Sequence, residues 1–173
     1  RDEPDVQVRR QLAATAKRID AKVALPIIRS LLANDAYAND PHMPLMIWWA
    51  LESQTSAWPA IKLMLSDPTT WSLPVFRDHI ASRLMQRYAA SGSPAELQNC
   101  AELLELAPDA DDRERLMTGL NRAFQGQSLP TLPDRLAVAL KSYQASLGDS
   151  GLVLGIRQGQ TERVQEALAV LKN

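Results

Sequence analysis

Residues 5–13 read Asp-Val-Gln-Val-Arg-Arg-Gln-Leu-Ala, and this stretch indicates how the chain folds. An aspartate side chain accepts backbone N–H groups at the start of a helix, so Asp5 is expected to cap a helix over residues 5–19. One stripe of that helix carries the apolar residues Val8, Leu12, Ala16 and Ile19. A second helix is expected over residues 21–33, with Pro26 near its first turns or bending it.

The same helical spacing recurs along the chain, whereas alternating strand patterns and hairpin turns are nearly absent. Asp40 is expected to cap a helix over residues 41–52, and Ser93 a helix over residues 94–106, each with proline at its first position. The other expected helices cover 57–65, 71 or 74 to 90, the stretch from the aspartates of 109–112 to Phe124, 133–147, 151–158 and 161–171. About ten short helices in succession indicate stacked neighbours, the alternative being an irregular globular helical domain.

Residues 5–13 resemble the second helix of a HEAT repeat unit, in which a capping aspartate precedes valine and arginine. Residues 25–32 resemble the first helix of such a unit, and Asp40 matches the cap position. Pro44 and Leu45 stand where that unit would have valine and arginine. The predicted fold class is therefore all-α, a right-handed α-solenoid of about five HEAT-like antiparallel helix pairs.

One HEAT-like domain is expected to span residues 1–173. In such a repeat the arginine lies one turn beyond the capping aspartate and can reach the equivalent aspartate of a neighbouring unit. Asp5, Arg9 and Asp40 are therefore predicted to belong to a ladder that ties successive units together.

Three segments together resemble one protein family. Residues 8–17, 24–32 and 40–52 are similar to the helical-repeat region of the large PVC-type haem-binding CxxCH proteins, which are membrane-bound, dehydrogenase-like multidomain proteins. The resemblance implies a parent chain that also carries a propeller-like dehydrogenase domain and a c-type cytochrome module. It also implies a periplasmic or otherwise extracytoplasmic location.

This sequence itself holds no Cys-x-x-Cys-His, so covalent haem attachment would belong to another part of such a parent. The chain opens with Arg-Asp-Glu-Pro and no signal-like segment, which is interpreted as a fragment of a larger protein.

The composition excludes several classes of partner. Lys and Arg number 19 and Asp and Glu 20, so the net charge of −1 offers no general attraction to phosphate backbones, and nucleic acid is not expected. The strongest apolar run, residues 43–51, is shorter than the roughly 18 residues that span a bilayer, so membrane insertion is not expected. The single cysteine, Cys100, shares a helical face with leucines and is interpreted as a core thiol.

No catalytic, cofactor-binding or metal-binding residues are predicted, and no cofactor is expected. His42 and His79 are isolated from other metal-ligand types, which indicates capping or surface roles. Glu102 and Glu105 are interpreted as a solvated helix face. The aspartates of 109–112 are interpreted as the favourable start of a helix.

Two clusters are candidates for an interaction surface. Adjacent Trp48 and Trp49 cannot both face one core, so one is expected to fill the inter-helix layer while the other points to a neighbouring repeat or a groove. Packing of both tryptophans against flanking repeats is the alternative. Arg83 and Arg87, four residues apart, can present a small basic patch or a salt-bridged helix face.

The predicted function is that of a non-catalytic scaffold, not an enzyme. Its expected partners are proteins, either other domains of the parent chain or a separate partner protein. The alternative is a carbohydrate- or peptide-binding module that uses the helices bearing tryptophan and arginine.

Overall fold

The computed structural model describes residues 5–125 and 131–147, and all regular structure within these ranges is helical. The predicted all-α class is therefore confirmed for the described part of the chain. The helices expected over residues 151–158 and 161–171 lie outside the described residues.

The first half of the chain contains α1 (Val6–Ala16), α2 (Ala21–Leu32), the short 3₁₀ helix η1 (Asp35–Asn39), α3 (Met43–Glu52) and α4 (Trp58–Leu65). The second half contains α5 (Thr69–Ser72), the π-helical turn η2 (Phe76–Ile80), α6 (Ala81–Ser91), α7 (Pro94–Leu106), α8 (Ala110–Ala123) and α9 (Asp134–Leu147).

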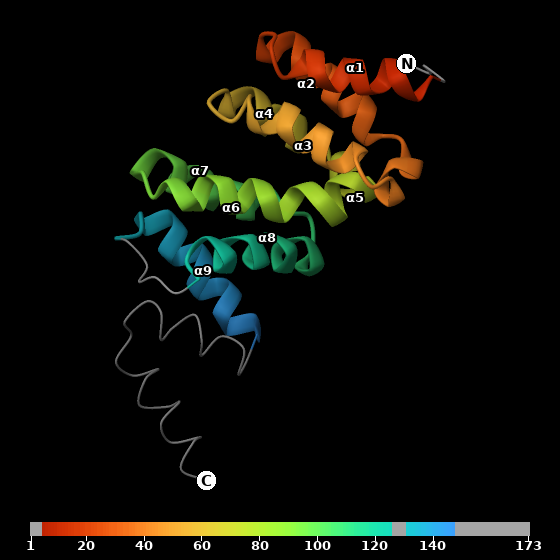
Figure 1. Ribbon diagram of the computed structural model, residues 1–173. Coiled ribbons are helices and arrows are strands. Elements are labelled where there is room, and N and C mark those ends of the chain that lie inside the picture. Colours follow the sequence, from red (N-terminus) through yellow and green to blue (C-terminus); the bar gives the residue numbers. More distant parts are fainter. Residues whose placement is uncertain (1–4, 126–130, 148–173) are drawn as a thin grey trace.

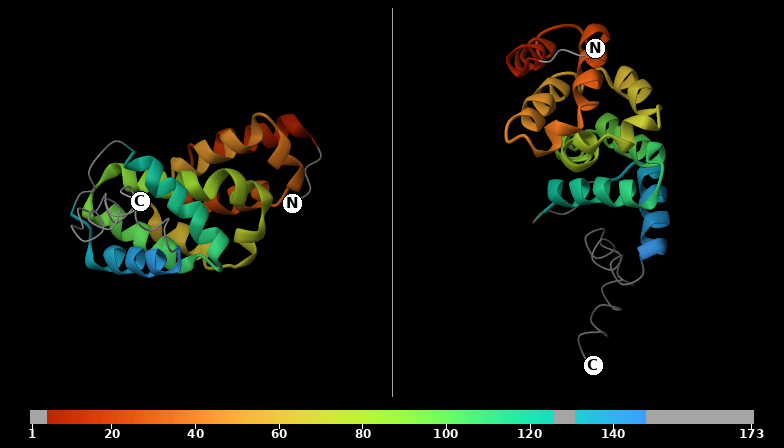
Figure 2. Two further views of the ribbon diagram at one scale, coloured as in Figure 1. Left: turned by 90° about the horizontal axis from the view of Figure 1, so that it is seen from below. Right: turned by 90° about the vertical axis from the view of Figure 1, so that its right-hand side faces the viewer.

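The helices stack in two layers, and the chain passes back and forth between the layers from one end of the molecule to the other (Figure 1). In the first layer α1 packs on α3, α3 on η2, and α6 on α8. In the second layer α2 packs on α4, α4 on α7, and α7 on α9. The right-hand view of Figure 2 shows the layers as two columns. We call one helix of the first layer and its neighbour in the second layer a level. Each level therefore packs on the next level along the chain.

The first helix ends earlier than expected, and a side chain from the segment between α3 and α4 binds the carbonyl groups at and just after its end. α1 stops at Ala16, and Gln54 Nε2 donates to Ala16 O at 3.0 Å and to Ile19 O at 3.2 Å. Gln54 lies between α3 and α4 and is only 7% exposed. One buried amide thus satisfies the end of α1 and fixes it against the next helix pair.

The predicted position of Pro41 at the start of a helix is wrong. Asp40 Oδ1 accepts the backbone N–H groups of His42 and Met43, both at 2.8 Å, and these bonds lower the pKa of the Asp40 carboxyl. Asp40 therefore caps the turn that contains Pro41 and not the helix itself, whose N-cap residue is His42. The helix begins at Met43, with Pro44 in its first turn.

Of the two proposed starts for the helix that ends near residue 90, the later one is observed. Leu73 is extended, with φ −68° and ψ 123°, as expected for a residue before proline. Helical structure resumes at Pro74 and continues through η2 and α6 to Ser91. Gly92 then adopts a left-handed conformation with φ 65°, which favours glycine and ends the helix.

The core is continuous between the two layers. Its largest fully buried side chains include Trp71, Tyr88 and Phe76. Cys100 is also fully buried, and this burial raises the pKa of its thiol to about 12. The interpretation of Cys100 as a core thiol is confirmed.

Candidate functional site

A polar cleft of about 840 Å³ lies beside the first helix pair. Its walls come from α1, α2, η1 and the loop between α4 and α5. Its polar lining consists of Arg9, Arg29, Ser30, Asn34, Asp35, Tyr37 and Asp67, and its apolar lining of Leu12, Pro26, Leu31, Ala33 and Ala36. Two cationic and two anionic side chains thus face one concave surface.

Arg29 extends from α2 toward the loop after α4. Its Nη2 donates to Thr69 Oγ1 at 2.8 Å and lies 3.6 Å from Asp67 Oδ2. Asp67 Oδ1 accepts the hydroxyl of Thr69 at 2.8 Å and its backbone N–H at 3.0 Å. These bonds, more than Arg29, hold the pKa of Asp67 below its usual value. Arg29 is therefore positioned by a hydroxyl group, while its ion pair with Asp67 is loose.

Arg9 is held on the α1 side of the same cleft. Its Nη1 donates to the hydroxyl of Tyr37 at 2.6 Å, and its guanidinium carbon lies 5.5 Å from the centre of the Tyr37 ring. Tyr37 is only 4% exposed, so a buried ring from η1 fixes the position of this arginine. Asn34 Oδ1 accepts the N–H of Ala36 and shapes the turn that carries Tyr37.

The three residues predicted for the repeat ladder lie at the start of α1, within α1 and before α3. Asp5 accepts the N–H of Gln7 at the start of α1, Arg9 contacts Tyr37, and Asp40 caps the turn before α3. Arg10, the neighbour of Arg9, contributes to the lowered pKa of Asp40.

The two adjacent tryptophans differ in burial. Trp48 is 8% exposed and packs in the core, whereas Trp49 is 46% exposed. Lys17 places its Nζ 5.9 Å from the centre of the Trp49 ring. Leu45, one helical turn before Trp49, is also exposed. The outer face of α3 therefore presents one aromatic side chain beside a cation.

The two arginines of the predicted basic patch are both partly buried on α6. Arg87 Nη1 lies 3.6 Å from Glu96 Oε1 of α7, so it forms an inter-helix ion pair. The Nη1 atom of Arg83 is buried and has no hydrogen-bond partner among the described residues. None of the four residues predicted for the interaction surface lines the polar cleft. They lie on α3 (Trp48 and Trp49) and on α6 (Arg83 and Arg87).

The two histidines also lie outside the cleft. His42 precedes α3 and donates its backbone N–H to Asp40. The Nε2 of His79 lies 2.8 Å from the carbonyl oxygen of Ala38, which joins η2 to η1. Within residues 5–125 and 131–147, no group of three or more His, Cys, Asp or Glu side chains could hold a metal ion.

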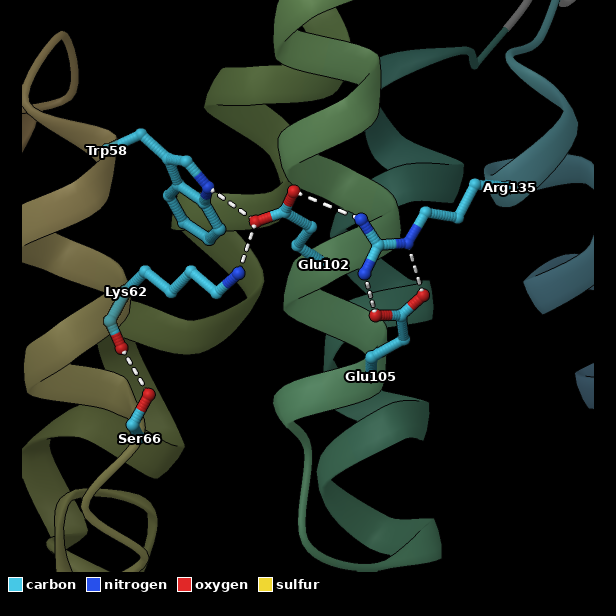
Figure 3. Close-up of polar contacts among 6 residues, drawn as sticks. All are labelled: Trp58, Lys62, Ser66, Glu102, Glu105 and Arg135. Carbon is cyan, nitrogen blue, oxygen red and sulfur yellow. Dashed lines mark hydrogen bonds and ion pairs between the residues drawn. The ribbon is translucent and has the colours of Figure 1, made fainter.

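A second cluster of charges joins three helices of the second layer (Figure 3). Glu102 of α7 accepts the indole N–H of Trp58 at 2.9 Å and lies 2.9 Å from Lys62 Nζ, both from α4. Arg135 of α9 donates to the same carboxylate at 3.1 Å and also pairs with Glu105 through two nitrogens. These contacts lower the pKa of Glu102, with the Trp58 bond as the largest cause.

The interpretation of this pair of acids as a solvated helix face is wrong for Glu102. Its side chain is only 16% exposed, whereas that of Glu105 is 45% exposed. The indole, Lys62 and Arg135 surround the Glu102 carboxylate because α4, α7 and α9 are neighbours in one layer.

Sequence reasoning missed the polar cleft entirely. Arg29 and Thr69 are 40 positions apart in the chain, and Arg9 and Tyr37 are 28 positions apart. One local signal existed, since Asp67-Pro-Thr-Thr is typical of a turn in which the aspartate accepts nearby N–H groups. That signal predicts the turn but not the arginine that meets it.

Comparisons of the chain with models of protein families, with curated proteins and with solved structures returned no match. Across the described ranges, no helix combines the length and apolar character required to cross a membrane.

Proposed function

We propose that this chain is a non-catalytic helical-repeat scaffold that binds a partner protein in the polar cleft beside α1 and α2. In this proposal the helix pairs belong to a right-handed α-solenoid of the HEAT type. The layered packing of α1 on α3 and of α2 on α4, repeated at later levels, supports the proposal. Stacked helix pairs provide extended concave surfaces for binding.

The proposed binding role rests on the polar cleft. Its volume of about 840 Å³ lies within the roughly 300–1,000 Å³ typical of ligand sites. Arg9 and Arg29 are each held in place by a hydroxyl group, of Tyr37 and Thr69 respectively. A surface whose charged groups are positioned before binding loses less conformational entropy when a partner binds.

A peptide is favoured over a carbohydrate as the occupant. Carbohydrate recognition through aromatic stacking requires exposed rings, and Trp48, Trp58 and Trp71 are each at most 9% exposed. Trp49 alone among the tryptophans offers an accessible face, and it lies outside the cleft. The cleft instead presents donors and acceptors that match the backbone and polar side chains of a peptide.

The parent protein is a separate proposal that rests on the sequence resemblance of residues 8–17, 24–32 and 40–52. If the chain belongs to a haem-binding CxxCH protein, the protein purified from its native cells carries covalent haem. Haem staining of the denatured native protein tests this, and an unstained band of known sequence contradicts it.

Site-specific photo-crosslinking tests the proposed function. A photoreactive amino acid is placed at Ser30 or Ala36, which are exposed and line the cleft, and at Thr118, which is exposed on α8. We expect one discrete crosslinked partner from the two cleft positions in the producing cells, and none from Thr118. Equal crosslinking at all three positions, or none at any, would contradict a binding role for the cleft.

A further inference from the structure

We propose that the polar cleft binds a carboxylate group of its partner peptide and that Arg29 is the residue that recognises it. This inference rests on the proposed function, because it names the chemistry of the partner at the same site. It extends that function from peptide binding in general to peptides that present an Asp or Glu side chain or a free C-terminus.

Arg29 can donate more hydrogen bonds than it makes within the described residues. A guanidinium carries five N–H donors arranged to bind a carboxylate through two parallel bonds. Within the described part of the chain, Arg29 donates one hydrogen bond, from Nη2 to Thr69. Its Nε and Nη1 groups donate to no acceptor there. The side chain is 27% exposed, so these donors can be reached from the cleft that it lines.

Asp67 is the acid that lies nearest to Arg29. Its Oδ2 atom lies 3.6 Å from Arg29 Nη2, which is beyond the distance of a hydrogen bond. Its Oδ1 atom is engaged by Thr69 within the same turn. Asp67 is therefore held mainly by its own loop, and its long ion pair with Arg29 leaves Arg29 able to bind a second, closer carboxylate.

The rest of the cleft matches the polar and apolar groups of a peptide. Arg9 adds a second positive charge, and its Nη1 is positioned by Tyr37. Asp35 and the amide of Asn34 supply polar groups for backbone N–H and C=O groups, and Leu12 and Pro26 supply apolar surface. A cleft of about 840 Å³ is much larger than a lone carboxylate requires, so the carboxylate is expected to arrive on a chain.

Binding of short random peptides to the intact chain tests the inference. The peptides are presented in two sets, one with a free C-terminal carboxylate and one with a C-terminal amide, and affinities are measured by fluorescence anisotropy. If the ligand is a C-terminus, binders occur in the free set alone. If it is an acidic side chain, binders in both sets contain Asp or Glu and lose affinity when it is changed to Asn or Gln.

Arg29→Gln is expected to weaken the binding of these peptides about tenfold or more, because a charge-assisted pair is lost. Arg29→Lys should recover part of the affinity, since it restores the charge without the two-pronged geometry. Arg122→Gln, which removes the same charge from an exposed position on α8, should bind as the unaltered chain does. Should Arg29→Gln fail to fold, the change in affinity on peptide amidation or Glu→Gln exchange still shows whether the chain recognises a carboxylate of the peptide.

Absence of any acidic or free-terminus binder, or equal affinity for Arg29→Gln, would overturn the carboxylate inference. Crosslinks from Ser30 and Ala36 that persist in that case would leave the proposed function standing. Loss of both the peptide binding and the crosslinks would reject the two proposals together.

Discussion

The indole Nε1 of Trp58 donates to Glu102 Oε2 at 2.9 Å, and this bond joins α4 to α7. Lys62 and Arg135 pair with the same carboxylate from α4 and α9, so one acid on the middle helix contacts both of its neighbours. Trp58 also packs edge-on against Tyr88, with ring centres 5.3 Å apart. The second layer is therefore connected by one partly buried polar group in addition to its apolar core.

Glu102→Gln is expected to reduce the free energy of unfolding by about 1–3 kcal/mol near neutral pH, because hydrogen bonds to a charged group are lost. The folded state lowers the pKa of Glu102 from its usual 4.5. The stabilisation is therefore present above that value and disappears as the pH falls through the lower, folded value. Urea denaturation of both proteins from neutral to acidic pH measures the difference.

Glu105→Gln is the matched control, since Glu105 pairs with Arg135 alone among the same residues and is 45% exposed. An exposed ion pair is weakened by the surrounding water, so Glu105→Gln is expected to cost less stability than Glu102→Gln. Equal losses for the two variants, or a loss for Glu102→Gln that does not change with pH, would contradict the role assigned to Glu102.

Gly119 permits the closest approach of two helices in the first layer. A Cβ atom on Gly119 of α8 would lie 2.0 Å from the backbone carbonyl oxygen of Ser82 on α6. Because the obstacle is backbone, α8 would have to move away. Gly119→Ala is therefore expected to destabilise the protein by about 1–3 kcal/mol, even though alanine favours helix.

Thr118→Ala, at an exposed position on the same helix, should change stability by no more than about 0.5 kcal/mol. Thermal and urea unfolding of the two variants measure the contrast. A Gly119→Ala protein as stable as the unaltered chain would show that α6 and α8 do not meet at this point.

Asp112 is expected to respond to pH in the sense opposite to Glu102. Burial, helped by the nearby Asp109, raises the pKa of Asp112 above its usual 3.8, and Arg115 offsets only part of this. Folding thus favours the protonated form, so stability is lost as the pH rises through the folded pKa. Asp112→Asn should increase stability near pH 7, on the order of 1 kcal/mol or less, and this gain should shrink in acid.

The same denaturation series run on Asp112→Asn checks this prediction. A variant that is less stable than the unaltered chain at neutral pH would mean that the ion pair with Arg115 outweighs the cost of burial.

Local signals in the sequence predicted the helices, whereas they could not predict the contacts between levels. Ser93 caps its helix as predicted and Asp40 caps the turn before α3, because capping involves N–H groups within three residues. Gln54 and Glu102 gave no such signal. The carbonyl groups that Gln54 binds at the end of α1 are 35 or more positions away, and the partners of Glu102 are 33 or more positions away. Their roles depend on which helices become neighbours.

Cys100 is expected to react slowly with thiol reagents in the folded protein. Burial raises the pKa of its thiol to about 12, so the reactive thiolate is scarce at neutral pH. The reaction with a disulfide reagent should be at least an order of magnitude slower in buffer than in concentrated urea. A native rate similar to the rate for the unfolded chain would show that the α7 core is open to solvent.

The most direct test of the proposed binding role is to map where the crosslinked partner, or a peptide from it, contacts the chain by NMR titration. We predict shifts in the amide signals of Arg29, Asn34 and Thr69 and in the guanidinium signal of Arg29, with Trp49, Arg83 and Arg87 unchanged. Shifts confined to Trp49, Arg83 and Arg87, with the signals of the polar cleft unmoved, would contradict it.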